Sequence, residues 1–194
     1  MTLRALVLCC SLRRSPSPSS SELLGREVLA ALADHDVDGT VVRVADHDVH
    51  FGVSADEGSV DGWPAIRAQL LDAQILVVAT PIWMGQPASV CKMVLERLDA
   101  ELTTGTMTGK VAAVAVVGNE DGAHHVTAEV LQALNDVGCT VPAAASTYWV
   151  GEAMGKVDYK DAGPKPGTTA SATRTLAANA AHLARLLRST PYPS

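Results

Sequence analysis

The sequence is poor in aromatic residues, has no excess of basic charge and contains no long apolar run. Aromatic side chains make up 4% of its 194 residues, and its formal net charge is −6. A negatively charged protein without a basic stripe is a poor partner for nucleic acid or an anionic membrane. A membrane-spanning helix needs roughly 18 or more apolar residues, a length that no stretch of the chain reaches. We therefore expect a cytoplasmic protein whose partners are small molecules.

Cysteine is scarce as well, and its spacing excludes a cysteine-based framework. The four cysteines are Cys9, Cys10, Cys91 and Cys139, and no C-x-x-C pair occurs among them. Structural zinc sites and the disulfide scaffolds of secreted domains need closely patterned cysteines. Free cysteine is among the most buried residue types. We predict four buried, reduced thiols.

One short sequence repeat is present: the pentapeptide ADHDV occurs at 33–37 and again at 45–49. Two short copies cannot form a solenoid, which needs longer repeats that stack. The second copy brings His47, Asp48 and His50 close together in sequence. A metal site needs three or four convergent ligands, and Asp-rich and His-rich surface loops are common, so we predict no metal site.

The length suits one domain, predicted to span residues 1–194. Five stretches resemble strands by composition and length, at 3–9, 40–44, 74–79, 110–117 and 140–144, the last with an extension towards Trp149. Five stretches have helical apolar periodicity, at 20–33, 63–71, 87–98, 123–136 and 170–188. The acidic, glycine-rich segment 45–62 and the loop 151–169 are predicted to be irregular. This alternation indicates an α/β fold with a doubly wound parallel sheet and helices on both faces, either a dinucleotide-binding Rossmann sheet or a five-stranded flavodoxin-like sheet.

The segment 74–99 is the most informative part of the chain. An apolar run at 75–79 is typical of a strand buried on both faces. Thr80 and Pro81 are predicted to end this strand, and Gly85 and Pro87 to keep the next residues irregular before a helix begins. Open α/β sheets hold ligands at the carboxyl ends of their strands. We therefore predict the functional site at 81–89.

The turn after the first strand contains six serines and no glycine between positions 10 and 24. A dinucleotide-binding fold would need G-x-G-x-x-G at this turn. Hydroxyl groups in front of a helix, beside its free N–H groups and positive dipole end, suit a single phosphate monoester. The alternative is that one serine caps the helix and the others belong to a solvated loop. The loop by itself does not decide between the two.

The same loop raises a remote alternative. A cysteine followed by Arg14 and Ser15 resembles the phosphate loop of low-molecular-weight protein tyrosine phosphatases, in which the thiolate stands six residues before the arginine. That position holds Leu8, and Cys9 and Cys10 lie too close to the arginine for the loop to wrap a phosphate. A receiver-like domain is a second remote alternative, but the chain has Cys-Ser and Thr-Pro where that fold needs acidic residues.

Three loops together resemble the NAD(P)H-dependent FMN reductase family of flavodoxin-like proteins, over residues 3 to about 150. The first, S-L-R at 11–13 with three serines at 19–21, is similar to the family's G-S-L-R…S-x-N loop. The second, T-P-I-W at 80–83 with Q-P at 86–87 and Lys92, resembles T-P-x-Y…P…K. The third is G-N-E-D-G-A-H at 118–124. Departures from the pattern are Cys10 for glycine, Ser21 for asparagine and Trp83 for tyrosine.

The resemblance implies a flavodoxin-like fold, bound FMN, and NADH or NADPH as hydride donor. The acceptor would be a quinone, an azo or nitro compound, or free flavin, and the protein a homodimer or homotetramer. The phosphate would be held by Ser11, Arg13, Ser19 and Ser21, with Ser20 as helix cap. The flavin ring would lie between two loops, one with Pro81, Ile82, Trp83, Met84 and Gly85, and the other with Gly118, Asn119, Glu120, Asp121 and Gly122.

Because the chemistry of such an enzyme belongs to the flavin, no catalytic residue of the protein is expected. His124 and His125 open a helix whose dipole favours a neutral imidazole, and His124 is a candidate for the substrate side. The alternative function is a flavodoxin-type electron carrier, which usually has a T-x-T-G-x-T loop that this chain lacks. Segment 151–169 is expected either to cover the site or to contact a neighbouring subunit. Trp63, Trp149 and Met154 are candidates for such a contact.

Overall fold

The computed structural model describes residues 2–193. A central sheet has the strand order β2-β1-β3-β5-β6, and each neighbouring pair is parallel. With the short β4 set aside, this is the 2-1-3-4-5 order of flavodoxin-like folds. Of the two predicted architectures, the flavodoxin-like sheet is therefore the correct one. The strands are β1 (Leu3–Cys9), β2 (Val37–Arg43), β3 (Ile75–Trp83), β4 (Gln86–Pro87), β5 (Val111–Gly118) and β6 (Ser146–Val150).

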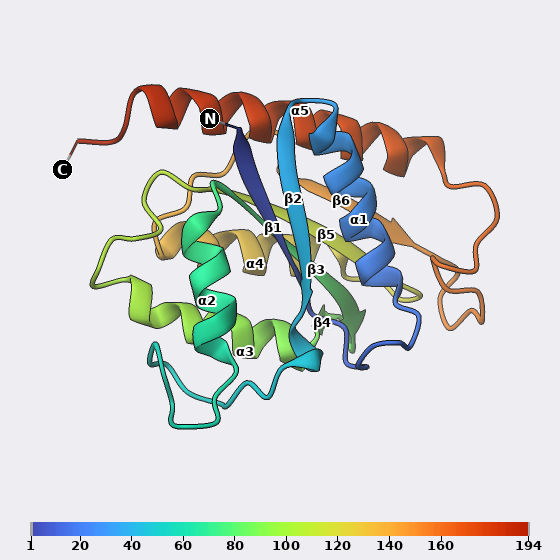
Figure 1. Ribbon diagram of the computed structural model, residues 1–194. Helices are drawn as coiled ribbons and strands as arrows, with labels where there is room; N and C mark the ends of the chain where they lie inside the picture. The colour runs from blue at the N-terminus through green and yellow to red at the C-terminus, as the bar shows by residue number, and fades with distance from the viewer. Residues whose placement is uncertain (1, 194) are drawn as a thin grey trace.

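Helices cover both faces of the sheet, as Figure 1 shows. The helices are α1 (Ser20–Ala33), α2 (Trp63–Asp72), α3 (Ser89–Arg97), α4 (Ala123–Asp136) and α5 (Gly167–Ser189), with 3-10 turns at Val44–Asp46 and Leu98–Glu101. Helices α1 and α5 pack on one face, and α2, α3 and α4 on the other. Along β1, β3 and β5 the buried residues belong alternately to two clusters, one on each face, as a sheet covered on both sides requires. The doubly wound prediction is confirmed.

The third strand is longer than predicted. Residues Thr80 and Pro81 do not end it: β3 continues to Trp83, and Pro81 is paired in register with Val117 of β5. The chain then reverses through a two-residue turn into β4, which pairs with β3 in antiparallel fashion. The segment predicted as irregular is therefore a hairpin, which gives the site a fixed wall.

The fifth strand was predicted at 140–144 with an extension towards Trp149, and only the extension is a strand. Thr140 makes only an isolated bridge to Val111, and the paired strand is β6, at Ser146–Val150. Pro142 carries no N–H to donate to a ladder, and Ala144 has a positive φ of 53° that turns the chain. Of residues 140–144 only Pro142 is buried, so the apolar composition indicated neither burial nor a ladder at this point.

Other boundaries differ by a few residues. The strand predicted at 40–44 begins at Val37, which is in register with Leu3 of β1. Its first residues were missed because β2 is an edge strand whose polar side chains face solvent. Helix α3 begins at Ser89 and ends at Arg97, inside the predicted 87–98. Helix α5 begins at Gly167, so the irregular segment before it is 151–166.

The polar segment 47–62 is irregular, as predicted, and a buried ion pair holds it. Arg97 of α3 donates to Asp61 at 2.6 Å, and both side chains are fully buried. Arg97 also donates to the carbonyl oxygens of His50 and Ser54 and lies over the ring of Trp63. Trp63 itself is fully buried, so its predicted role in a subunit contact is wrong.

Candidate functional site

Three loops meet at the carboxyl ends of the adjacent strands β1, β3 and β5. The loop after β1 begins at Cys10, whose backbone N–H donates to the carbonyl of Ala79 in β3 at 2.8 Å. The β3–β4 turn and the loop after β5 are joined by the carboxylate of Glu120. The three segments singled out from the sequence therefore lie along one edge of the sheet.

The serines of the first loop sit at the start of α1. Ser19 is the N-cap, and its Oγ accepts from the backbone N–H of Glu22 at 3.2 Å. The Oγ of Ser20 accepts from the backbone N–H of Lys160 at 3.2 Å, so the cap is Ser19 and not Ser20. Ser11 and Ser21 are buried. Since a hydroxyl that accepts a hydrogen bond keeps its own hydrogen to donate, these serines retain donors for an anion.

The loop is shaped by a buried arginine that sequence reasoning missed. Arg43, the last residue of β2, forms an ion pair with Glu22 and donates to the carbonyl of Ser17 at 2.7 Å. Its Nη1 also lies 3.4 Å from the carbonyl oxygen of Arg13. The side chain of Arg13 is exposed at the surface of the loop. The feature that could have identified Arg43 is its position at a strand end opposite the loop. Only the strand register reveals that position.

Burial keeps the thiols at the end of β1 protonated. Burial raises the pKa of Cys9, despite hydrogen bonds to Ser11 and Ser19 that act in the opposite direction. Cys10 is fully buried on the other face of the sheet, and its hydrogen bond with Cys91, together with burial, raises its pKa well above the ordinary value. All four cysteines are free and buried, as predicted. Burial of both thiols disfavours the thiolate that the phosphatase-like alternative needs at this loop.

The β3–β4 hairpin forms an exposed wall beside this loop. Met84 and Gly85 make its turn with positive φ angles of 54° and 73°, which is the backbone of a tight two-residue hairpin. Trp83 is 54% exposed and Met84 90% exposed. Pro81 is half-buried and Ile82 buried, so these two support the wall from behind. An exposed tryptophan on a rigid hairpin is a flat apolar surface without a partner inside the described chain.

The loop after β5 is tied to this hairpin. Glu120 accepts hydrogen bonds from the backbone N–H groups of Met84 at 3.2 Å and Gly85 at 2.9 Å. Gly122 has a φ of 128°, and a Cβ there would lie 2.9 Å from the carbonyl oxygen of Gly85. Only glycine permits this approach. The predicted ligand residue Glu120 thus binds the protein's own backbone, at two donors that also face the predicted ring site.

The other predicted residues of this loop have distinct partners. Asp121 accepts from the backbone N–H of Gly122 at 2.7 Å. Asn119 donates through Nδ2 towards residues of segment 151–166, namely the carbonyl of Gly155 at 3.2 Å and the carboxylate of Asp158 at 3.3 Å. Gly118 packs against Ile82, which an added Cβ would approach within 2.9 Å. The loop therefore contacts the hairpin on one side and segment 151–166 on the other.

Two histidines at the start of α4 extend the polar rim. The Nε2 atom of His124 lies 3.1 Å from the hydroxyl of Tyr148, and the two rings meet edge to face. The Nε2 atom of His125 lies 3.1 Å from Oε1 of Gln86 in β4. Tyr148 was missed because it belongs to β6, which was misplaced in the sequence prediction. The rim offers groups that exchange protons beside the hairpin.

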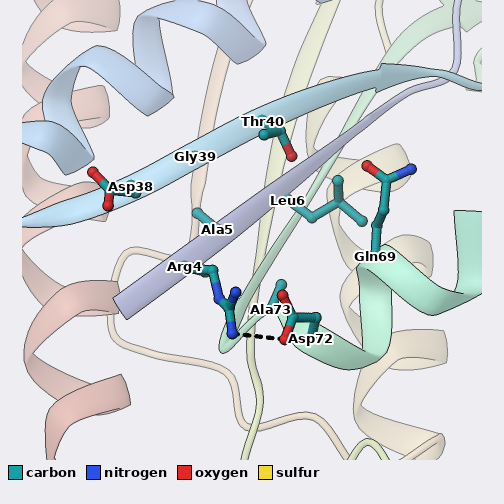
Figure 2. Close-up of a pocket in the computed structure, with 9 residues that line it drawn as sticks. All are labelled: Arg4, Ala5, Leu6, Asp38, Gly39, Thr40, Gln69, Asp72 and Ala73. Carbon is teal, nitrogen blue, oxygen red and sulfur yellow. Dashed lines mark hydrogen bonds and ion pairs between the residues drawn. The ribbon is translucent and has the colours of Figure 1, made fainter. Parts of the chain in front are cut away.

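Two cavities lie away from this edge. One, of about 310 Å³, is at the amino ends of β1 and β2 and is drawn in Figure 2. Its main polar feature is the exposed ion pair between Arg4 and Asp72, with the nitrogen and oxygen 2.7 Å apart. The other, of about 550 Å³, lies between α3 and α4. Ligand sites in open α/β sheets lie at the carboxyl ends of strands, so we place the candidate site at the three loops.

Comparisons with known proteins give the family and the fold of the chain. Residues 3–154 match the family described as NADPH-dependent FMN reductase. The chain is 36% identical over 208 residues to 8-demethyl-8-aminoriboflavin-5'-phosphate synthase of Streptomyces davaonensis, covering 99% of this chain and 81% of that protein. It is also 36% identical to a Mycobacterium bovis protein named divalent metal cation transporter MntH, but spans 29% of that protein's length. The transporter name is therefore not carried over.

Solved structures are similar to this chain over nearly its whole length. The crystal structure of RosB with the bound intermediate 8-demethyl-8-formylriboflavin-5'-phosphate superposes with a TM-score of 0.88 at 35% identity, covering 98% of this chain and 82% of that one. An archaeal flavodoxin has a TM-score of 0.61 at 12% identity, covering 94% of this chain and 99% of that one, a likeness in fold alone. None of the described helices is long and apolar enough to cross a membrane. Within residues 2–193, no three His, Cys, Asp or Glu side chains gather as a metal site would require.

Proposed function

Since the chain belongs to the NADPH-dependent FMN reductase family, we propose that it binds FMN at the three loops and passes a hydride from NADH or NADPH through the flavin to a small acceptor. The observation that carries this proposal is the convergence of a serine-rich helix start, an exposed tryptophan hairpin and the Glu120 loop at one sheet edge. An FMN-dependent oxidoreductase is the activity class of the family. The proposal includes NADH or NADPH as donor and a small molecule as acceptor. It also includes a cytoplasmic location and assembly as a homodimer or homotetramer.

The residues present fit FMN. The phosphate end would take hydroxyl donors from Ser11, Ser19 and Ser21 and the guanidinium of Arg13, which suit a phosphate monoester. The ring would lie against Trp83 of the hairpin, since a flat apolar wall with a few polar groups is what a flavin site needs. The bound flavin would supply the hydride chemistry.

The role of the chain's own residues is then to bind, orient and exclude water. Trp83 and Ile82 supply apolar surface on one side of the ring site, and backbone groups of the Gly118–Gly122 segment supply polar edges on the other. His124, hydrogen-bonded to Tyr148, stands at the rim, where it would hold a proton for a reduced acceptor. A buried nucleophile is not required, in agreement with the neutral thiols.

A second function has a specific observation in its favour. The relative from Streptomyces davaonensis, named as a synthase of an aminoriboflavin 5'-phosphate, is 36% identical over nearly the whole chain, whereas the archaeal flavodoxin is 12% identical. In this second proposal the flavin phosphate is the substrate, altered at its position 8, and the same three loops hold it. Both functions need the phosphate and ring contacts described above.

One experiment separates the two. Purified protein is mixed anaerobically with stoichiometric FMN and then with excess NADPH or NADH in a stopped-flow spectrometer. A reductase bleaches the flavin rapidly, reoxidises it with a quinone over many turnovers, and returns FMN of unchanged mass. Flavin that stays oxidised with both nicotinamides contradicts the reductase proposal. A changed flavin mass after aerobic incubation supports the second proposal, and failure to bind FMN at all contradicts both.

A further inference from the structure

Segment 151–166, here called the strap, connects β6 to α5 and runs beside the first half of α1 (Figure 1). It contains no helix or strand. The family match ends at residue 154, so most of the strap lies beyond what the family shares. The Streptomyces davaonensis relative aligns over 99% of the chain. The role of the strap is therefore argued from its contacts within this chain.

One aromatic residue anchors the strap to the body of the protein. Tyr159 is 1% exposed, and its hydroxyl donates to the carboxylate of Glu27 on α1. Its ring lies 5.5 Å from the ring of Trp149 in β6, and the ammonium of Lys165 lies 4.0 Å from the ring centroid. Burial, followed by the Glu27 hydrogen bond, raises the pKa of Tyr159, so the phenol stays neutral. A loop held by a buried aromatic side chain has a fixed position.

On either side of this anchor the strap contacts the two ends of the candidate site. The backbone N–H of Met154 donates to the carbonyl of Asn119 at 2.9 Å, and Asn119 donates back to Gly155 at 3.2 Å. The backbone N–H of Lys160 donates to the Oγ of Ser20 at 3.2 Å. Asn119 belongs to the loop assigned to the ring, and Ser20 to the helix start assigned to the phosphate. The strap thus spans the site from end to end.

The bond to Ser20 has a chemical consequence. A hydroxyl oxygen accepts through its lone pairs and donates one hydrogen. Because the Ser20 oxygen accepts from Lys160, its hydrogen is left to donate to another acceptor near the start of α1. At this contact the strap contributes a backbone N–H and not a positive charge. The Lys160 ammonium is held by Asp158 at 2.8 Å and Asp161 at 2.5 Å and is not a free cation.

We propose that the strap is part of the ligand site, and that by fixing Ser20 at the phosphate end and Asn119 at the ring end it controls the release of a bound flavin 5'-phosphate. Tyr159 is then a positioning residue for that ligand. The inference rests on the proposed binding of FMN, and it holds for a flavin that serves either as cofactor or as substrate. It adds a ligand-retaining element that the family resemblance does not supply.

The chain offers a matched pair of variants. Tyr159→Ala removes the anchor, whereas Tyr192→Ala removes the same kind of side chain at an exposed position beside Thr140, away from the strap. We expect the FMN dissociation rate constant to rise by about tenfold or more in Tyr159→Ala and to stay within about threefold of the parent in Tyr192→Ala, since interface losses appear mainly in dissociation. Dissociation is followed by flavin fluorescence after dilution.

A second measurement needs no variant. Hydrogen exchange of the parent is compared with and without FMN, and we expect FMN to slow exchange in peptides from 151–166 while peptides from the last turns of α5 are unchanged. The proposal is wrong if FMN binds but strap exchange is unaltered, or if folded Tyr159→Ala releases FMN at the parent rate. If the parent fails to bind FMN, the proposed function fails first. Should Tyr159→Ala not fold, the exchange result on the parent decides.

Discussion

The carboxylate of Glu120 accepts the backbone N–H of Gly85 at 2.9 Å, although the two residues are 35 positions apart. The neighbouring N–H of Met84 binds the same carboxylate at 3.2 Å. In a two-residue hairpin the N–H groups of the turn have no partner within the hairpin itself. One side chain therefore satisfies both donors, and it fixes the separation between the two loops proposed to enclose a flavin ring.

The first prediction concerns this contact. Glu120→Gln keeps the shape of the side chain but leaves one oxygen where there were two, so one turn N–H loses its acceptor. We expect the free energy of unfolding to fall by about 0.5–1.5 kcal/mol, and amide exchange at Met84 and Gly85 to become faster. Urea unfolding and residue-resolved exchange measure this. Glu129→Gln, on the exposed face of α4, is the control, and equal exchange in the two variants would contradict the prediction.

The second prediction concerns Trp83. Because this side chain is 54% exposed, Trp83→Ala should leave thermal stability nearly unchanged. It should weaken FMN binding, since an aromatic contact contributes about 0.5–1.5 kcal/mol beyond burial, and it should alter the fluorescence of bound flavin. Phe51→Ala, an even more exposed aromatic in segment 47–62, is the matched control. An unchanged FMN dissociation constant in Trp83→Ala would remove the hairpin from the site.

The third prediction tests the phosphate end. Replacing Ser19 and Ser21 together by Ala removes the N-cap of α1, which should cost about 0.5–2 kcal/mol of stability. Charge-assisted hydrogen bonds contribute about 1.5–3 kcal/mol each, so FMN affinity should fall by at least about tenfold. Riboflavin affinity should not change. Titration of both flavins measures this, with Ser171→Ala on α5 as control, and an equal loss for riboflavin would show that the phosphate is bound elsewhere.

The fourth prediction concerns the buried pair of Asp61 and Arg97. Although burial alone would raise it, hydrogen bonds from Arg97 and from three backbone N–H groups hold the pKa of Asp61 well below its ordinary value of 3.8. Asp61→Asn leaves Arg97 buried without a counter-charge, and we expect a loss of about 3–5 kcal/mol. Asp72→Asn breaks the exposed pair with Arg4 and should cost about 0–1 kcal/mol.

The sign of the pH dependence follows from the lowered pKa. A carboxyl whose pKa is lower in the folded than in the unfolded state contributes fully above the unfolded pKa, and that contribution is lost as the pH falls towards the folded value. The stability difference between the parent and Asp61→Asn should therefore be constant near neutral pH and shrink below about pH 4. Urea titrations at several pH values measure it. A difference that grows in acid would show that the carboxylate is not stabilised by its partners.

The sequence was a good guide to the sheet but a weaker guide to the site. Periodicity located α1 and α4 to the residue, because each helix has a continuous apolar stripe and a boundary signal, the run of serines before α1 and Gly138 after α4. The β3–β4 hairpin was missed because Thr80 and Pro81 usually signal a strand end. In the structure, pairing of Pro81 with Val117 overrides that local signal.

Contacts between distant segments could not be predicted from local patterns. The apolar character of 140–144 indicated a strand, yet Pro142 and the turn at Ala144 move the ladder to β6. Arg43, Tyr148 and the bonding of Glu120 to the hairpin depend on strand register, which a single sequence does not specify. Resemblance to a family located the three loops, but only the packing shows which partners their side chains already have.

The four buried thiols make the chain its own reporter of local opening. Cys9 lies beside Ser19 on the α1 side of the sheet, whereas Cys10 and Cys91 belong to the cluster under α2, α3 and α4. An alkylating reagent reaches a buried, neutral thiol only when the packing around it separates and the thiol can ionise. The order in which the native protein loses its thiols to such a reagent would therefore show which layer of helices leaves the sheet first, without any label having been introduced.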